Sequence, residues 1–233
     1  MNSVFFEDLG NMAYKAAWDY QEELFAKIVS QKSANRKLPL EEQIKTNDHL
    51  LFVEHPPVFT LGKSGNEANL LINHQKLKEE KIDFFKINRG GDITYHGPGQ
   101  LVGYPILNLD HYFTDIHKYL RFLEEAIILT MAEYGLAGER SPKETGVWLD
   151  VGKPAARKIC AMGVRASRWV TMHGFAFNVN TNLKHFGYIV PCGITGKAVT
   201  SLNLELGHEV PMEEVKGKVK KHLADLFEFE ILG

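Results

Sequence analysis

The sequence RGGDITYHGPGQLVGY, residues 89–104, says more about the fold and the site of this chain than any other stretch. Glycines and a proline stand here among arginine, threonine, histidine and glutamine side chains. Glycine allows positive φ and lets a ligand come close to main-chain N–H groups. A single Gly-Gly or Gly-Pro pair is more often a structural turn, but the polar residues between these glycines are of the kind that hydrogen-bond a ligand. The run therefore predicts a ligand-binding loop.

Outward from this loop, the apolar pattern predicts both helices and strands. Apolar residues recur every four positions over 12–29 and 116–134, which is typical of amphipathic helices. A further helix is expected after Pro211. The polar segment 31–46 is expected to be an exposed loop, and 70–81 to be a helix or a loop.

Short apolar runs predict the strands. These are residues 49–54, 84–88, 101–107, 147–149, 158–164 and 170–180. Because the helices and strands do not alternate strictly, we expect a single α+β domain over residues 1–233, with a mixed, largely antiparallel sheet and flanking helices.

Composition narrows the function. The chain has 233 residues, 44% apolar and 24% charged, which is ordinary for a soluble globular protein. A formal charge of −2 argues against a protein that binds nucleic-acid backbones. No apolar run reaches the roughly 20 residues of a membrane helix, and the N-terminus has no signal-peptide pattern. Two cysteines make no disulfide framework, so the chain is expected in the reducing cytoplasm.

Cys192 is a candidate nucleophile. It stands between Pro191 and Gly193, which oppose a regular strand and favour a turn. Cysteine attacks as the thiolate, so a neighbouring base or positive charge must raise its ionised fraction. A free cysteine is more often a small buried hydrophobe, and the residues alone leave both roles open. Cys160, inside an apolar run, fits the buried role better.

Lys158 is a candidate base because it directly precedes the apolar run Ile159–Met162. An ammonium drawn toward such a core is partly desolvated, which favours the neutral form that accepts a proton. The alternative is an exposed lysine at the start of a strand. Side chains two apart on a regular strand point to the same side, so Cys160 can line any site that Lys158 faces.

Five blocks of the sequence resemble the lipoate-protein octanoyltransferases. In the glycine-rich run, the matching residues are Arg89, Gly90, Gly91, Thr94, Tyr95, His96, Gly99, Gln100 and Tyr104. The other blocks are residues 53–60, 158–165, 173–180 and 191–193. They occur in the family's order between about residues 47 and 202.

The resemblance implies the fold of biotin and lipoate ligase catalytic domains and an acyl transfer without cofactor or metal. Octanoyl-acyl carrier protein would be the donor. Lipoyl domains of 2-oxoacid dehydrogenases and the glycine cleavage H protein would be the acceptors, with no nucleic acid or membrane as partner. By the same resemblance, Cys192 is the nucleophile that forms an acyl thioester, and Lys158 activates it. Apart from the resemblance, a monomer is the default expectation for the oligomeric state.

The resemblance also implies which residues contact the acyl substrate, where small side chains would leave a narrow apolar slot. They are Arg89, Gly90, Gly91, Asp92, Ile93, Thr94, Tyr95, His96, Ala161, Met162, Gly163, Gly174, Phe175 and Ala176.

Three alternatives remain open from the sequence. The first is an ATP-dependent lipoate or biotin ligase on the same fold, which needs no cysteine nucleophile. The second is a cysteine hydrolase, which needs His96 or His173 beside the thiol. The third is a binding module without catalysis that docks a lipoyl domain.

Overall fold

A computed structural model describes residues 2–142, 144–190 and 198–233. Its larger sheet has the strand order β12-β1-β2-β6-β10-β9-β8-β7, with β11 beside β9. The strands from β2 to β7 in this order pair antiparallel, whereas β1 is parallel to both its neighbours and β11 is parallel to β9. The predicted α+β class and the mixed, largely antiparallel sheet are therefore confirmed.

The strands of this sheet are β1 (Asn2–Asn11), β2 (Asp48–Glu54), β6 (Gln100–Ile106), β7 (Glu139–Arg140), β8 (Gly146–Leu149), β9 (Arg157–Ser167), β10 (Val170–Asn178), β11 (Ala198–Val199) and β12 (Phe229–Leu232).

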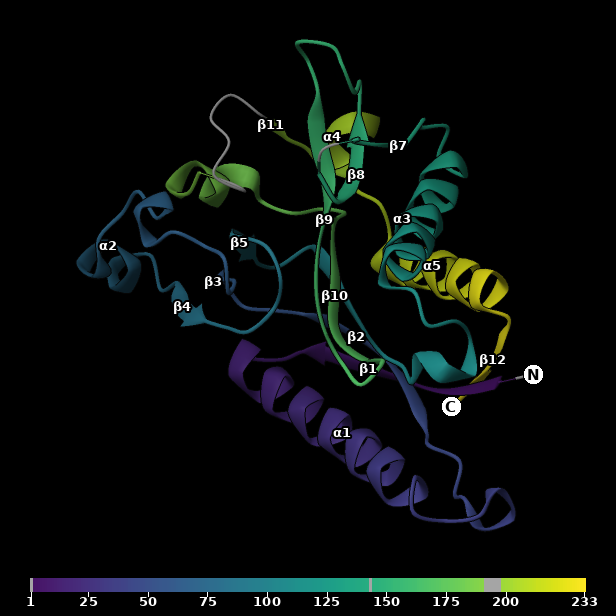
Figure 1. The fold of residues 1–233 in the computed structure, drawn as a ribbon. Coiled ribbons are helices and arrows are strands. Elements are labelled where there is room, and N and C mark those ends of the chain that lie inside the picture. Colours follow the sequence, from purple (N-terminus) through teal and green to yellow (C-terminus); the bar gives the residue numbers. More distant parts are fainter. Residues whose placement is uncertain (1, 143, 191–197) are drawn as a thin grey trace.

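A second, smaller sheet lies beside the first and carries the glycine-rich run. It consists of β4 (Asp83–Lys86), β3 (Val58–Leu61) and β5 (Ile93–His96), with the short helix α2 (His74–Glu79) on the connection (Figure 1). Residues 89–104 are thus not one continuous loop, because Ile93–His96 pair antiparallel with β3. The sequence prediction is wrong over these four residues and holds for the turns on either side of them.

Helices cover both faces of the large sheet. Helix α1 (Tyr14–Asn35) lies on one face, and α3 (Ile116–Ala132) and α5 (Met212–Phe227) lie on the other (Figure 1). The short helix α4 (Leu202–Leu206) follows β11. Side chains along β10 point alternately to the two faces of the sheet, so the strand contributes to two separate parts of the core. Met172 and Ala176 pack toward α1, whereas Phe175 and Phe177 pack toward α3 and α5.

The predicted helices and all the predicted strands are present, with shifted ends. Helix α1 continues to Asn35, so the first part of the expected loop 31–46 is helical. Strands β1 and β12 were not predicted, because each depends on a partner at the opposite end of the chain. Among the described residues, no helix combines the length and the apolar character that crossing a membrane requires.

Candidate functional site

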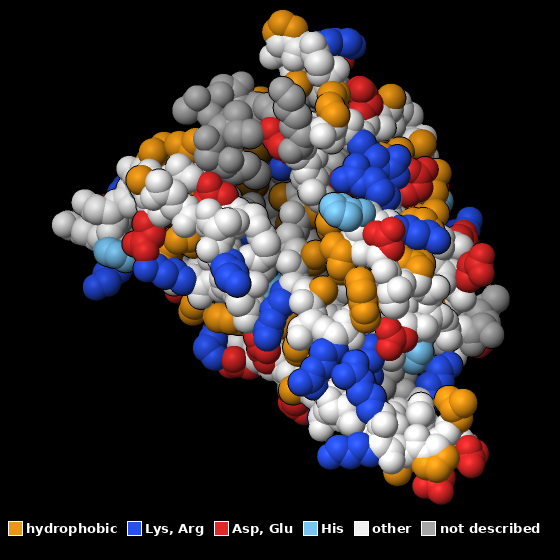
Figure 2. All heavy atoms as spheres, in the orientation of Figure 1, with side chains coloured by type: hydrophobic (Ala, Val, Ile, Leu, Met, Phe, Trp, Pro, Cys, Tyr) orange, Lys and Arg blue, Asp and Glu red, His pale blue; other side chains and the backbone are white. Residues whose placement is uncertain are grey.

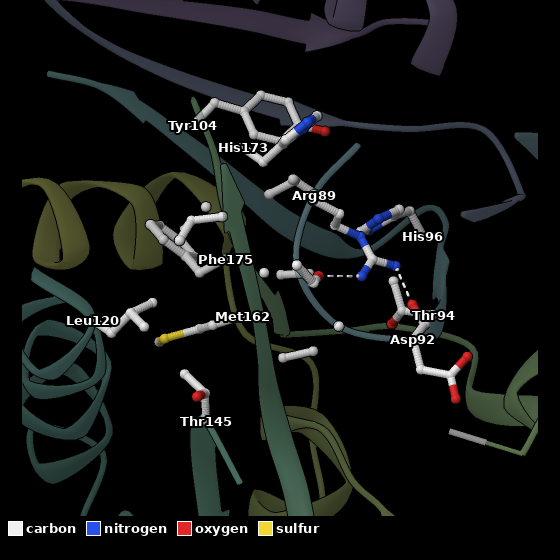
Figure 3. A pocket seen from close by; sticks show the side chains of 18 of the residues that line it. Arg89, Asp92, Thr94, His96, Tyr104, Leu120, Thr145, Met162, His173 and Phe175 are labelled. Atoms are coloured by element: carbon white, nitrogen blue, oxygen red, sulfur yellow. Dashed lines mark hydrogen bonds between the residues drawn. The ribbon is translucent and has the colours of Figure 1, made fainter. Parts of the chain in front are cut away.

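A cavity of about 390 Å³ opens between the small sheet, strands β9 and β10, and helix α3. Figure 2 shows the surface hollowed near the centre of the molecule, and Figure 3 shows the side chains that surround the cavity. All the predicted contact residues except Tyr95 line it, together with Lys158. The structure therefore brings together three blocks that are far apart in the sequence.

Arg89 fixes the loop at one side of the cavity. Its guanidinium donates hydrogen bonds to the carbonyls of Gly90, Thr60 and Asp92 at 2.8–2.9 Å. The Gly90 N–H donates to the carbonyl of Val164 on β9 at 2.9 Å. The loop of the small sheet is thereby attached directly to a strand of the large one.

Two glycines on the cavity wall, Gly163 and Gly174, allow neighbouring main chains to approach closely. A Cβ on Gly163 would lie 2.8 Å from the Gly90 carbonyl oxygen, and a Cβ on Gly174 would lie 2.2 Å from that of Gly103. Both missing side chains would thus point into neighbouring backbone. Close packing of main chains is therefore a reason for glycine at these two positions that the sequence analysis did not foresee, beside the expected narrow slot for the acyl chain.

Asp92 connects the cavity to the segment that leads toward Cys192. One carboxylate oxygen accepts from the Asn66 and Ile93 N–H groups, and the other accepts from Asn69 Nδ2 at 2.5 Å. The Asn69 carbonyl in turn accepts from the N–H of Val190 at 2.8 Å. Val190 is therefore tied, through Asn69, to a residue of the cavity wall.

Lys158 is almost entirely buried and lines the cavity, with 8% of its surface exposed. Its ammonium lies 4.6 Å from the centre of the Trp148 ring and donates to the Thr145 carbonyl at 3.3 Å. A cation over an aromatic face at this distance is attracted by the ring's quadrupole. The side chain thus has a defined position on the cavity wall.

Cys160 does not line this cavity. The pairing of β8 with β9 shifts by one residue, so that Trp148 faces Lys158 while Val147 faces Cys160. Trp148 and Val147 are neighbours and point to opposite sides, so Lys158 and Cys160 do as well. The expectation that Cys160 shares the side of Lys158 is wrong. Its thiol is buried in the core, and burial raises its pKa, which keeps it protonated.

Cys192, with Pro191 and Gly193, lies outside the described residues. The residues that flank this stretch are described. On one side, Val190 is held by Asn69. On the other side, Ala198 and Val199 pair with Arg157 and Lys158, and the Thr200 N–H donates to the Lys158 carbonyl at 2.9 Å.

Two histidines of the cavity wall are neutral near pH 7. Burial lowers the pKa of His96 to about 3 and that of His173 to about 3, and the charge of Arg89 acts in the same direction. His96 Nδ1 hydrogen-bonds Gln100 Oε1 at 2.8 Å, and its ring stacks on Tyr14. Both imidazoles are thus integrated into the wall as uncharged hydrogen-bonding groups.

Tyr95 packs on the other side of β5. Its ring lies against Phe59 and Phe186, and its hydroxyl hydrogen-bonds His185 Nδ1 at 2.8 Å. The predicted contact between Tyr95 and a substrate therefore has no counterpart in the cavity lining.

Several lining residues were not among the predicted contacts. They are Tyr14, Val102, Tyr104, Leu120, Glu144, Thr145, Val164 and His173. Tyr104 and His173 belong to blocks that already carried the family resemblance, so a signal for them existed. Tyr14 and Leu120 occupy ordinary apolar positions of helices, and only the tertiary structure brings them to the site. Within the described residues, no three acidic, histidine or cysteine side chains gather as a metal site would require.

The fold and the cavity define the class of the protein. The model of the lipoyl protein ligase A/B catalytic domain family matches residues 13–224. A bipartite lipoate protein ligase of Thermoplasma acidophilum superposes with a TM-score of 0.69 at 16% identity, covering 99% of this chain and 85% of that one. A lipoate-protein ligase A bound with ATP gives 0.67 at 15% identity, covering 100% of this chain and 89% of the other. At these identities the likeness shows the fold alone.

Closer sequence relatives specify the family. Octanoyltransferase of Christiangramia forsetii is 65% identical over 225 residues, covering 96% of this chain and 95% of the relative. That of Flavobacterium johnsoniae is 65% identical over 227 residues, with 97% of both covered. That of Bacteroides thetaiotaomicron is 49% identical over 219 residues, with 94% and 93% covered. The chain belongs to the octanoyltransferase family of acyltransferases.

Proposed function

We propose that this protein transfers an octanoyl group from octanoyl-acyl carrier protein to a lysine of a lipoyl domain, through a thioester on Cys192. The observation that carries the proposal is the position of Lys158 on the cavity wall, hydrogen-bonded through its main chain to the residues that follow the Cys192 segment. The other flank, Val190, is held by Asn69, which is bonded to Asp92 of the same wall. Both connections support a thiol close to this amine.

In the first half of the reaction, Cys192 Sγ attacks the carbonyl carbon of the donor thioester. Lys158 Nζ, in its uncharged amine form, accepts the thiol proton, the bond to the carrier's sulfur breaks, and the proton passes to that leaving thiolate. An octanoyl thioester on Cys192 results. Covalent catalysis of this kind divides one acyl transfer into two steps.

In the second half, the uncharged ε-amine of the target lysine attacks the octanoyl carbonyl. An amide bond forms, the bond to Cys192 Sγ breaks, and the thiolate recovers a proton that the amine loses through Lys158. The donor is already a thioester and the product is an amide, so this scheme needs no ATP.

The cavity suits an aliphatic chain. Leu120, Met162 and Phe175 form an apolar side next to Thr145, with Val102 and Ala176 on the wall as well (Figure 3). Pockets of this kind bury a ligand in apolar surroundings with a few polar groups to orient it. We further propose that 2-oxoacid dehydrogenases and the glycine cleavage H protein supply the acceptor domains, and that the enzyme acts as a cytoplasmic monomer.

Intact-mass measurement tests the proposal. Wild-type protein incubated with octanoyl-acyl carrier protein, without ATP, is expected to gain one octanoyl group, and Cys192→Ala is expected to gain none. Cys160→Ala is the matched control and keeps the adduct, because that thiol is in the core. An adduct that persists in Cys192→Ala and disappears in Cys160→Ala would show that the nucleophile is wrongly assigned. Addition of a lipoyl domain must then transfer the group to a lysine rather than release free octanoate.

A further inference from the structure

His173 has an unusual backbone conformation in the middle of strand β10. Its φ is +57°, in the left-handed region that residues other than glycine rarely occupy. Its N–H donates to Gln21 Oε1 on helix α1 at 3.0 Å, while the carbonyl of Val164, its register partner, accepts from Gly90. Strain of this kind persists where the surroundings impose it, and it is frequent at functional sites.

The neighbours of His173 fix its tautomer. Asn88 Nδ2 donates to a carboxylate oxygen of Glu22 at 3.2 Å, so Asn88 Oδ1 is the atom that faces His173 Nε2 at 3.1 Å. That oxygen can only accept, so Nε2 carries the proton. Since burial keeps the imidazole neutral, Nδ1 is a bare acceptor. Nδ1 is buried and has no hydrogen-bond partner among the described residues.

Two further polar side chains are neighbours of His173: the Tyr104 ring, whose centre is 6.5 Å from that of the imidazole, and Gln21, which accepts from the His173 N–H. His55 Nδ1 donates to the Met12 carbonyl at 2.7 Å, so its Nε2 accepts from the Tyr104 hydroxyl, also at 2.7 Å. The Tyr104 oxygen therefore still has a lone pair to offer. Gln21 is fully buried, and its Nε2 meets no partner with good hydrogen-bond geometry within the described part of the chain. Its amide nevertheless acts on the Tyr104 hydroxyl as a weak hydrogen-bond donor, which lowers the pKa of that hydroxyl against the stronger effect of burial.

We propose that a buried water molecule joins these three groups and forms the polar end of the acyl cavity. The water accepts from Gln21 Nε2 and donates to His173 Nδ1 and to Tyr104 Oη. A buried water typically makes about three such bonds to groups that the protein leaves unpaired. Without it, one buried donor and one buried acceptor would each carry a desolvation penalty.

The place of this water gives it a role in substrate selection, which rests on the proposed function. Thr145, which contacts Lys158, and the pair Tyr104 and His173 lie at opposite ends of the labelled side chains in Figure 3. Val164, the register partner of His173, is six residues beyond Lys158 on β9, which corresponds to at most about 20 Å. The thioester is formed at the Lys158 end, so the tail of the acyl chain points toward the water.

An acyl chain that extends into the polar end must displace the water and leave Gln21 Nε2 and His173 Nδ1 unpaired. A methyl end cannot replace those hydrogen bonds. The water thus limits the length of the chain that the cavity accepts.

Kinetics with donors of two lengths tests the role of the water. Gln21→Met keeps the length of the side chain and removes the amide, so the ratio of kcat/KM for decanoyl to octanoyl carrier protein is expected to rise on the order of tenfold. Gln31→Met is the matched control, because it makes the same change on the same helix, where the amide donates to Asn35 one turn further along. An unchanged ratio in Gln21→Met would overturn the proposed role.

A high-resolution crystal structure of the wild-type chain tests the water itself and does not depend on how the variants fold. Density is expected within hydrogen-bond distance of Gln21 Nε2, His173 Nδ1 and Tyr104 Oη. Direct pairing of these groups with one another, with no density between them, would contradict the inference. Wild-type protein that transfers no acyl group at all would refute the proposed function, while the density would still decide whether the water is bound.

Discussion

At the scale of single residues, the position of Lys158 depends on Trp148. The ring lies 4.6 Å from the ammonium, and both side chains are buried. Trp148→Leu removes the aromatic face, which is worth roughly 1–2 kcal/mol when desolvated. We expect kcat for octanoyl transfer to fall about tenfold, with little change in KM, because the ring does not line the cavity.

Trp148→Phe is the matched comparison, since it keeps an aromatic face and should recover much of the rate. Steady-state kinetics on all three proteins, with thermal unfolding to verify their stability, gives the measurement. Equal losses in the Leu and Phe variants would mean that the ring acts through core packing alone.

The buried histidines make stability depend on pH. The pKa of His96 is about 3 in the folded protein, below its ordinary value of about 6.5, because burial disfavours the charged form. The unfolded chain therefore binds more protons between these two values. The contribution of the uncharged His96 to the free energy of unfolding is therefore fully present above pH 6.5 and is lost as the pH falls toward 3.

His96→Asn is expected to flatten the dependence of the unfolding free energy on pH between 5 and 6 by up to about 1.4 kcal/mol per pH unit. Urea unfolding at several pH values measures the slope, and His208→Gln, at an exposed position, serves as the control. A slope in His96→Asn identical to that of the wild type would show that His96 does not remain neutral in the fold.

The sequence revealed the cavity residues that stand in distinctive motifs and missed those that do not. Arg89 and His96 are conspicuous in a glycine-rich run, and Lys158 stands at the edge of an apolar one. Gln21 is a polar residue in an ordinary helical pattern, and its burial against His173 follows only from the way α1 packs on β10. Contacts between such distant segments leave no local signal.

At the scale of elements, the approach of the Arg89–Asp92 loop to β9 depends on Gly163. A Cβ there would lie 2.8 Å from the Gly90 carbonyl oxygen and 3.1 Å from Arg89 Cδ. Gly163→Ala must therefore push the loop away, and we expect it to cost about 1–3 kcal/mol of stability and to lower the rate of octanoyl transfer.

Gly217→Ala is the control for this substitution. It lies within helix α5 with no atom near the added methyl group, so alanine should stabilise the protein by roughly 0.5–1 kcal/mol. Denaturant unfolding compares the two variants. Stabilisation by both would indicate that loop and strand are less closely packed than the structure describes.

The β9 strand also shows where periodicity fails as a predictor. The pattern of residues 158–164 predicted a strand correctly, and a strict period of two then placed Lys158 and Cys160 on one side. The one-residue shift opposite Val147 and Trp148 reverses that relation. A bulge depends on the partner strand, so the sequence of β9 alone could not predict it.

At the scale of the whole molecule, the cavity lies between two sheets that the chain must hold together. The small sheet is attached to β9 through the Gly90 N–H, and Arg89 bonds the Thr60 carbonyl of β3. Gln100, at the start of β6, accepts a hydrogen bond from His96 of β5 through Oε1 and donates one to Asn178 of β10 through Nε2. Because these bonds join strands of the small sheet to inner strands of the large one, the two sheets are expected to unfold together as one cooperative unit rather than as two domains.

We therefore expect the chain to unfold in a single transition. Under native conditions, the slowest-exchanging amides of β3 and β5 should share one opening free energy with those of β6 and β10, because the connecting bonds break only when both sheets open. Hydrogen exchange followed by mass spectrometry measures both groups. Arg89→Met removes the bonds to Thr60 and Asp92, and it should let the small sheet open at lower free energy than the large one. Independent opening of the small sheet in the wild type would mean that the site lies between two separately stable units.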